Sequence, residues 1–300
     1  MHIKTSAIGT HKHSQLFQKV ASMLVASCSS LVLAAAAPEP LTISPIAGNV
    51  HLVSGGSGAN ISVLAGVGEA LLVDGKGPAE TEQLRALVRE VSGGDVRYLI
   101  NGHEHPDHTD GNAAFGSTGT IIIAHEGVRE VLAAGQRGGP PAPAEALPTV
   151  TIGDGEKMTL HFADETVHFI AAPAAHSLYN AIVYYENANV LHLGDLYGPI
   201  RYPVLAGGTI DGLIAADEQA LALANENTKV IPGIGPLSSI ADLRAYVAML
   251  KAVKERVAAL AAEGKSLEDV LAAKVTAEFD ATWGDASRFL PTVYENVKPQ

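Results

Sequence analysis

Four side chains that commonly bind metal ions lie within six consecutive residues, in the order H-x-H-x-D-H: His103, His105, Asp107 and His108. Histidine and aspartate are seldom buried without partners, so packing alone does not account for such a cluster. Neutral imidazole nitrogens and carboxylate oxygens bind zinc at about 2.0–2.2 Å. The motif follows an apolar segment, residues 96–100, and therefore predicts a metal centre at the end of a strand.

The spacing of the motif suggests how it could hold more than one ion. In an extended segment, His103, His105 and Asp107 would share one face and His108 would project from the other. A turn at Pro106 would let the loop hold two metals. The first would then lie on His103 and His105, and the second on Asp107 and His108.

Two later residues extend the candidate metal centre. His176 follows a predicted strand at residues 167–171, and Asp195 follows one at residues 190–193 in a Gly-Asp turn. Each has an ordinary explanation alone, since histidine and aspartate are common in loops and turns. Together with the motif, both lie where strands end, and we expect them to converge on it.

The remaining sequence alternates between strand-like and helix-like patterns. Short β-rich runs separated by Gly and Ser predict strands, and a spacing of three to four between apolar residues predicts helices. Two αβ halves packed sheet against sheet follow from this alternation. The Gly- and Pro-rich residues 135–148 are expected to form a flexible surface loop beside the substrate site. The expected strands are 41–46, 50–53, 61–65, 70–73, 96–100, 121–124, 158–162, 167–171, 181–185 and 190–193, and the expected helices 78–91, 127–134, 213–224, 240–262 and 267–274.

Residues 1–37 have the features of a signal peptide. They carry Lys4, Lys12 and Lys19, and no acidic residue precedes Glu39. An apolar run over residues 20–37 ends in four alanines, a small-residue cleavage signature. A retained membrane anchor fits less well, because serine and alanine make the run weakly hydrophobic. We therefore expect export to the periplasm or the medium, with residues 38–300 as the mature domain.

The only cysteine, Cys28, lies in this leader. Its context, V-A-S-C, resembles a bacterial lipoprotein box, so a lipid tether through Cys28 is a second possibility after cleavage. The apolar run continues past Cys28, which favours cleavage. Either way, the mature domain has no cysteine for a disulfide, a thiolate ligand or a nucleophile.

The charge balance excludes one class of partner. The 20 basic residues fall to 17 once the three leader lysines are removed, against 32 acidic ones, which leaves a net charge of −15. Nucleic-acid binding depends on basic patches, so this balance argues against it. It suits an exported enzyme with a small-molecule substrate and no membrane span after leader removal. The sequence does not indicate an oligomeric state.

At this point the chain resembles the metallo-β-lactamase-fold superfamily of hydrolases. The resemblance covers roughly residues 41–237 and rests on N-G-H-E-H-P-D-H, the His176 turn, L-G-D ending at Asp195, and V-I-P-G at residues 230–233. It implies an α/β fold, a four-layer αββα sandwich with metals at one edge. It also implies roles for the candidate residues: His103, His105 and His176 for a first zinc, Asp107 and His108 for a second, Asp195 as a bridge, and Asp74 as a carboxylate that orients a ligand histidine.

The chain departs from that family at one position. The family usually has P-G-H-G before its last helices, and that histidine binds the second metal. Here Ile234 takes its place, and no histidine follows His192 to substitute for it. Isoleucine has no lone pair to donate. We therefore expect one firmly bound zinc and a weak or empty second site.

The expected chemistry is hydrolysis by a metal-activated water. Asp107 would orient the attacking water and carry a proton. The substrate would be a cyclic amide or ester, a β-lactam or a lactone, with thioesters also possible. Tyr197, Arg201 and Tyr202 follow Asp195 closely and are candidates to line the substrate pocket.

Two other functions remain open. His103, His176 and Asp195 alone make a 2-His-1-carboxylate set, as in mononuclear Fe(II) oxygenases such as the family's persulfide dioxygenases. Export to an oxidising compartment and an unused His105 argue against that alternative. Ile234 also allows a catalytically crippled, metal-binding variant.

Overall fold

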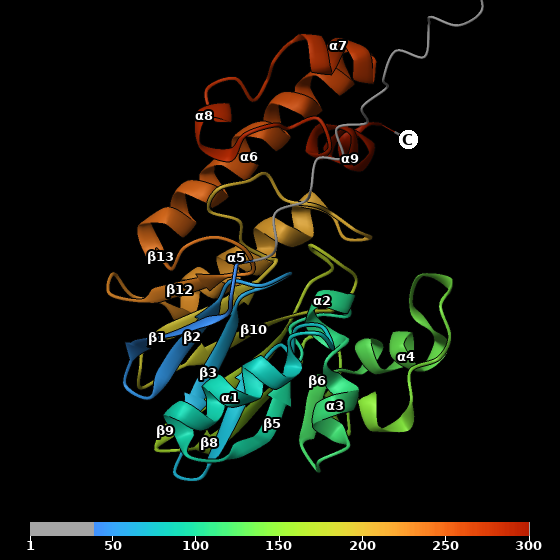
Figure 1. Cartoon of the computed structure of the whole chain (residues 1–300). Coiled ribbons are helices and arrows are strands. Elements are labelled where there is room, and N and C mark those ends of the chain that lie inside the picture. Colours follow the sequence, from blue (N-terminus) through green and yellow to red (C-terminus); the bar gives the residue numbers. More distant parts are fainter. Residues whose placement is uncertain (1–38, 300) are drawn as a thin grey trace, which may run out of the picture. The chain divides into compact units, whose positions relative to one another are not determined.

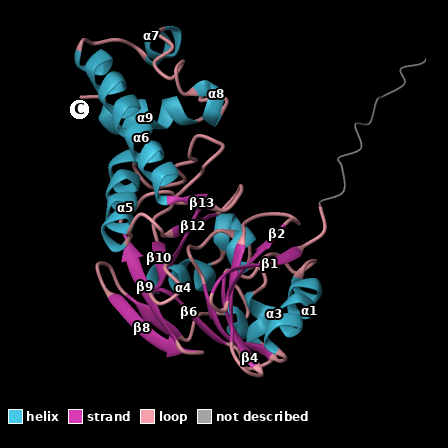
Figure 2. Cartoon of the chain, turned by 90° about the vertical axis from the view of Figure 1, so that its left-hand side faces the viewer, coloured by secondary structure: helices cyan, strands magenta, loops and turns pink. Residues whose placement is uncertain are grey.

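The computed structural model describes residues 39–299 of the chain, all within one compact unit. Two β-sheets pack face to face, and helices lie on the outer face of each (Figures 1 and 2). The layers follow the order helix, sheet, sheet, helix. The four-layer αββα sandwich predicted from the sequence is therefore confirmed.

The first sheet has seven strands in chain order, and the second has six in the order β13-β12-β11-β10-β9-β8. In the first sheet, β1 to β4 pair antiparallel and β4 to β7 pair parallel. In the second, only β11 and β12 pair parallel. The strands are β1 (Thr42–Ala47), β2 (Val50–Ser54), β3 (Ile61–Ala65), β4 (Glu69–Val73), β5 (Asp95–Ile100), β6 (Ile121–His125), β7 (Val150–Ile152), β8 (Lys157–Phe162), β9 (Glu165–Ala172), β10 (Asn180–Tyr185), β11 (Val190–Gly194), β12 (Lys229–Pro232) and β13 (Ser238–Ser239).

The helices divide between the two outer layers. α1 and α3 pack on the first sheet, α5 and α6 pack on the second, and α9 packs on α6. The longest, α6, spans the predicted residues and begins with a capping box of Ser239 and Asp242, which satisfies free N–H groups at its start. The helices are α1 (Thr81–Ser92), α2 (Pro106–Thr109), α3 (Asn112–Gly116), α4 (Glu126–Ala134), α5 (Ile210–Leu223), α6 (Ile240–Ala262), α7 (Leu267–Ala272), α8 (Asp280–Trp283) and α9 (Phe289–Val297), with 3-10 turns at Gln136–Gly138 and Ala144–Ala146.

The central core lies between the two sheets. Alternate residues of each strand face inward, for example Leu71 and Val73 of β4 opposite Val183 and Tyr185 of β10. Burying one such aliphatic side chain contributes about 1.5–3 kcal/mol. This core fixes the sheets against each other and so fixes the loops at their edge.

Several strands end at one edge of the sandwich. β4 and β5 run parallel, as do β11 and β12, and β9 shares the direction of β11 because both are antiparallel to β10. The segments after these strands carry Asp74, the H-x-H-x-D-H motif, His176, Asp195 and Ile234. The candidate residues from distant parts of the sequence therefore meet at this edge.

The sequence missed the shortest elements and one helix. Strands β7, β12 and β13 and helices α2, α3 and α8 have two to five residues each, too few to show a periodic pattern. Helix α9 contains Pro291, which a helix tolerates only in its first turn. The predicted loop 135–148 does lack helix and strand apart from its two 3-10 turns.

The predicted leader, residues 1–37, and Cys28 within it lie outside the described residues. Cleavage, a lipid tether and export therefore stay predictions. Within residues 39–299, none of the helices combines the length and the apolar character needed to cross a bilayer.

One buried carboxylate of α5 has a consequence for stability. Asp217 is fully buried, and neither of its carboxylate oxygens has a hydrogen-bond partner among the described residues. Burial raises the pKa of Asp217 well above its usual range. The folded state therefore retains a proton that the unfolded chain releases above about pH 3.9, and stability falls as the pH rises through that value.

We predict that Asp217→Asn, which cannot ionise, raises the free energy of unfolding at pH 8 by at least about 1 kcal/mol. The gain should shrink as the pH falls toward 4, because the unfolded chain then begins to protonate Asp217 as the folded state does. Urea denaturation at both pH values measures it. Glu218→Gln is the control, because the exposed Glu218 carboxylate pairs with Lys251 at the surface. An equal gain at both pH values would contradict the prediction.

Candidate metal centre

The H-x-H-x-D-H segment is bent and not extended. After β5, residues 102–105 form a series of bends, and α2 begins at Pro106. The turn at Pro106 thus begins a helix, which carries His108 back toward His103, with ring centroids 3.9 Å apart. The alternation of faces that an extended segment would produce therefore does not apply to residues 102–108. His103 lies close to both His105 and His108.

Three imidazoles converge on one point. His103 Nε2 lies 3.0 Å from His105 Nδ1, which lies 2.9 Å from His176 Nε2. The three ligand atoms all lie within 4.8 Å of one another. In a tetrahedral zinc site, with each ligand about 2.0–2.1 Å from the ion, ligand atoms are about 3.3 Å apart. The three nitrogens fit such a site.

Hydrogen bonds fix the loop of His176 and leave one of its ring nitrogens able to bind a metal ion. His176 Nδ1 lies 2.6 Å from the carbonyl oxygen of Val204 and donates to it, so Nε2 keeps its lone pair. Ser177 Oγ donates to Glu104 Oε2 at 2.8 Å, which ties this loop to the motif. Glu104, between the two motif histidines, thus fixes the second loop that the centre needs.

The electrostatics of this group favour neutral imidazoles. Burial lowers the pKa of His103, His105 and His176, and the neighbouring histidines lower it further. Neutral imidazole is the form that binds metal ions. These histidines can accept a metal without first losing a proton.

A second group adjoins the first. His103, His108 and Asp195 each offer a ligand atom within 4.8 Å of the others. Asp195 Oδ2 also lies 3.4 Å from His176 Nε2, so this carboxylate borders both groups, as a bridging ligand would. His108 Nε2 and Asp195 Oδ1 are buried without a hydrogen-bond partner among the described residues. Such unpartnered atoms in a site require an explanation, and a metal ion supplies one.

Asp107 lies at the margin of these groups. Its side chain is 42% exposed, and its Oδ2 lies 3.7 Å from His108 Nε2. Gly58 lies directly against it, since a Cβ atom there would be 2.6 Å from Asp107 Cβ. Asp107 is thus open to solvent at the mouth of the centre.

The turn that carries Ile234 packs against Asp195. A Cβ atom at Gly233 would lie 2.0 Å from Asp195 Oδ1, so only glycine fits there. Asn60 holds the turn by donating Nδ2 to the carbonyls of Pro232 and Gly235. Position 234 is therefore held close to the second group.

Asp74 connects the centre to a buried network between the sheets. Its Oδ1 accepts the N–H of Gly102 at 2.8 Å, and its Oδ2 lies 2.8 Å from His108 Nδ1 and 3.5 Å from His192 Nε2. His192 Nδ1 in turn lies 2.9 Å from Ser62 Oγ. The sequence pattern did not link His192 to the centre. Its position on β11, three residues before Asp195, was the available signal.

The charges of this network reinforce one another. Burial alone would raise the pKa of Asp74, but His108 and His192 hold it well below its usual range. Burial alone would lower the pKa of His108, but Asp74, Asp195 and Asp107 raise it to about 9. Asp74 therefore stays ionised and orients the His108 ring, and His108 Nε2 must lose its proton before it can bind a metal ion.

We predict that Asp74→Asn weakens metal binding at the group that contains His108 about 10- to 100-fold, because outer carboxylates that orient ligand histidines have effects of that size. Chelator competition measures the affinity. Asp154→Asn is the matched control, since Asp154 lies 3.1 Å from His125 Nε2 and away from the cluster. Equal affinities for both variants would contradict the role of Asp74.

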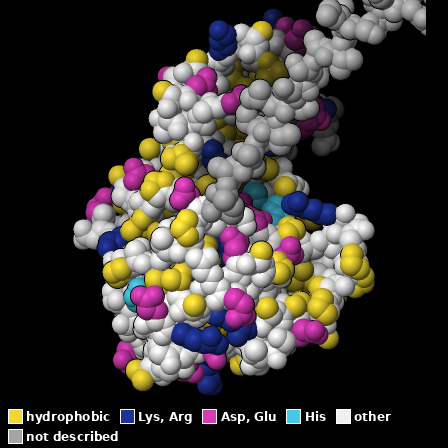
Figure 3. Space-filling model, in the orientation of Figure 1, with side chains coloured by type: hydrophobic (Ala, Val, Ile, Leu, Met, Phe, Trp, Pro, Cys, Tyr) yellow, Lys and Arg dark blue, Asp and Glu magenta, His cyan; other side chains and the backbone are white. Residues whose placement is uncertain are grey.

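Of the three candidate pocket residues, only one lies beside the centre in the structure. Arg201 Nη2 lies 3.8 Å from Asp195 Oδ2, and its side chain is 41% exposed, so Arg201 borders the centre. Tyr197 is buried against Tyr246, and Tyr202 is buried with its hydroxyl donating to Asp280. Both tyrosines pack toward the C-terminal helices, so the structure brings only Arg201 to the centre. Figure 3 shows histidine side chains at the surface with acidic and basic side chains beside them.

One buried cation near the centre was missed. Lys76 is 1% exposed and donates Nζ to the carbonyls of Gly55 and Ser57. Glu80 binds the same loop through the N–H and Oγ of Ser57. Together they hold the Gly55–Gly58 loop against Asp107. No local sequence pattern predicts that a lysine is buried, and the only indication for Lys76 is its place two residues after Asp74.

Comparison with known proteins gives a family match over most of the sandwich. A family model described as the metallo-beta-lactamase superfamily matches residues 54–233. Curated relatives include a hydroxyacylglutathione hydrolase of Polaromonas sp., 31% identical over 172 residues, and the 2,4-dinitroanisole O-demethylase subunit alpha of Nocardioides sp., 24% identical over 182 residues. The matches cover 55% and 58% of this chain and 57% and 54% of those proteins, so the chain spans about half the length of its curated relatives.

Solved structures share the fold. A metallo-beta-lactamase from Pontibacter korlensis has a TM-score of 0.60 at 18% identity, over 70% of this chain and 99% of that one. The DIM-1 metallo-beta-lactamase has a TM-score of 0.60 at 22% identity, over 71% of this chain and 98% of that one. At such identities the likeness establishes the architecture and not the substrate.

Proposed function

Because the chain belongs to the metallo-β-lactamase superfamily, we propose that it is an exported zinc-dependent hydrolase that cleaves a cyclic amide or ester with an activated water. The observation that carries the proposal is the convergence of His103 Nε2, His105 Nδ1 and His176 Nε2 within 4.8 Å. Three buried neutral imidazoles in this arrangement are suited to bind a metal ion.

Each residue of the centre has a part in this proposal. His103, His105 and His176 would hold the first zinc, and His108, Asp107 and Asp195 remain for a second. Bound zinc would supply a Lewis acid and a water whose pKa is about 7 instead of 15.7. Asp107, at the solvent-exposed mouth, would orient the attacking water and take up its proton.

The proposal includes an impaired second site. Ile234 stands where a third protein ligand specific to that site would be, and its side chain has no donor atom. Asp107, His108 and the shared Asp195 are left, and Asp107 lies outside the group formed by His103, His108 and Asp195. We therefore expect one firmly bound zinc per chain.

Two observations bear on the type of bond that is cleaved. Export favours a β-lactam, because the targets of β-lactams lie outside the cytoplasm. The 31% identity to a hydroxyacylglutathione hydrolase favours an ester or thioester. A lactone is both cyclic, like a β-lactam, and an ester, so it is the first substrate class to test.

Metal content and hydrolysis measured on the same purified sample test the proposal. Plasma mass spectrometry should find about one zinc per chain, with turnover of a lactone, a thioester or a chromogenic β-lactam. Two zinc ions would mean that another group replaces the missing histidine. Iron in place of zinc would favour the mononuclear oxygenase, and one zinc without turnover would favour the crippled variant. No metal after zinc supplementation would overturn the proposal.

A further inference from the structure

The loops around the centre carry an unusual share of the exposed aliphatic side chains. Among the described residues, seven large hydrophobic side chains are exposed, and four of them lie in the three loops that follow β9, β11 and β12. Single exposed aliphatic residues are normal on a protein surface, but a concentration around a site marks a binding surface. The four are Leu178, Ile200, Val204 and Leu237.

Two of these side chains lie beside His176. Val204 is 46% exposed, and its carbonyl oxygen binds His176 Nδ1. Leu178 is 50% exposed, two residues after His176, and lies against Gly207 of the loop that contains Val204. Both are therefore fixed to the backbone that positions a metal-binding histidine.

Ile200 lies in the same loop as Val204, next to the turn after β12. It is 54% exposed and packs near Gly235, in the turn that carries Ile234. Its neighbour Arg201 reaches Asp195. Asp195 Oδ2 lies 3.4 Å from His176 Nε2, so the loop that carries Ile200 and the loop that carries Leu178 both reach the centre.

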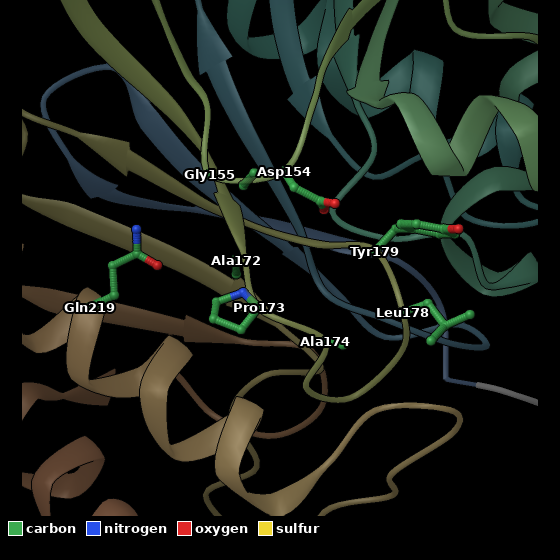
Figure 4. Close-up of a pocket in the computed structure, with 9 residues that line it drawn as sticks. Asp154, Gly155, Ala172, Pro173, Ala174, Leu178, Tyr179 and Gln219 are labelled. Carbon is green, nitrogen blue, oxygen red and sulfur yellow. The ribbon is translucent and has the colours of Figure 1, made fainter.

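A pocket continues this surface beyond Leu178. It has a volume of about 500 Å³ and contains none of the centre's residues. Figure 4 shows Leu178 at this pocket with Pro173, Ala174 and Tyr179, on the segment that also carries His176. An apolar substrate group that contacts Leu178 could therefore extend into this pocket.

We propose that the substrate carries an apolar chain, aliphatic or aromatic, which binds across Ile200, Val204 and Leu178 while its scissile bond lies at the centre. The inference rests on the proposed function, because it assigns that site its substrate class. The occupant is a substrate group, since these side chains lie on the loops that hold the centre.

A series of γ-lactones that differ only in the length of the alkyl chain tests the inference. For each added methylene, kcat/KM should rise about two- to fourfold, as expected for partial to full burial of a methylene. Ile200→Ser and Val204→Ser should flatten this dependence. Val67→Ser and Leu271→Ser are matched controls, since both are exposed aliphatic residues in other segments, and they should leave it unchanged.

Binding of the same lactones to metal-free protein, followed by NMR, separates this inference from the proposed reaction. Tighter binding of longer lactones, weakened by Ile200→Ser, would support the apolar surface even if no lactone were hydrolysed. Hydrolysis and binding that do not depend on chain length would overturn it and leave the hydrolase intact. A change of oligomeric state in Ile200→Ser, without any chain-length effect, would assign the surface to a second copy and also overturn it.

Discussion

Replacing His176 with alanine is expected to release the first metal ion and to reduce hydrolysis more than about 100-fold. Removing a residue that only orients a metal ligand already lowers metal affinity or activity 10- to 100-fold. Removing a ligand itself should therefore have a larger effect. His176 contributes one of only three nitrogens in the first group. Without it, the first group keeps only the two nitrogens of His103 and His105, one fewer than the three protein ligands of a catalytic zinc site.

Metal content and turnover of the His176→Ala variant should fall together, with the folded structure retained. His168→Ala is the control, because His168 pairs with Glu186 away from the centre. Circular dichroism checks that both variants fold. A His176→Ala protein that keeps one equivalent of metal and full activity would show that the reaction does not depend on the first group.

The candidate centre was largely predictable because its chemistry is local in sequence. His103, His105 and His108 lie within six residues, and a run of that composition has few structural explanations. His176 and Asp195 were identified less directly, from their positions after strands. Their convergence follows from the directions of β9 and β11 in the second sheet.

The orientation of the motif was not predictable. A four-residue helix such as α2 has no periodicity of its own, and its direction depends on contacts from elsewhere in the chain. Asn101, for example, donates to the His108 carbonyl and exchanges hydrogen bonds with Asn112. Such side-chain contacts between residues of one loop leave no pattern in the sequence.

The same limit applies to the residues that support the centre. The role of Asp74 was implied by the family resemblance, but the roles of His192 and Lys76 were not predicted. Their roles depend on which polar side chains the two sheets bury opposite one another, as Ser62 of β3 meets His192 of β11. The pairing of the sheets, and not any one strand, creates these contacts.

The buried network makes the centre part of the fold's central layer. Tyr185, Ser62 and His192 lie between the sheets and are all at most 1% exposed. Ser62 Oγ lies 2.8 Å from the Tyr185 hydroxyl, so the network extends from β10 through β3 to Asp74. A rigid support of this kind fixes the geometry of ligand histidines before a metal arrives, which favours binding.

Replacing Ile234 with histidine is expected to raise the metal content from about one to about two ions per chain. It should also increase kcat/KM at least about tenfold, equivalent to about 1.4 kcal/mol of transition-state stabilisation. The turn is already in place, because Asn60 holds it and Gly233 lies against Asp195. The substitution therefore adds a nitrogen donor where the backbone is fixed.

Two controls separate a restored ligand from a change in packing. Ile234→Ala removes the same side chain without adding a donor, and Leu237→His adds a histidine three residues further along the exposed part of the loop. Neither should bind a second ion. If Ile234→His binds two ions but its activity stays at the original level, the second metal does not limit the reaction. If Ile234→His still binds only one ion, the weak second site has a cause other than Ile234. The position of Asp107 at the margin of the centre would then be the next cause to test.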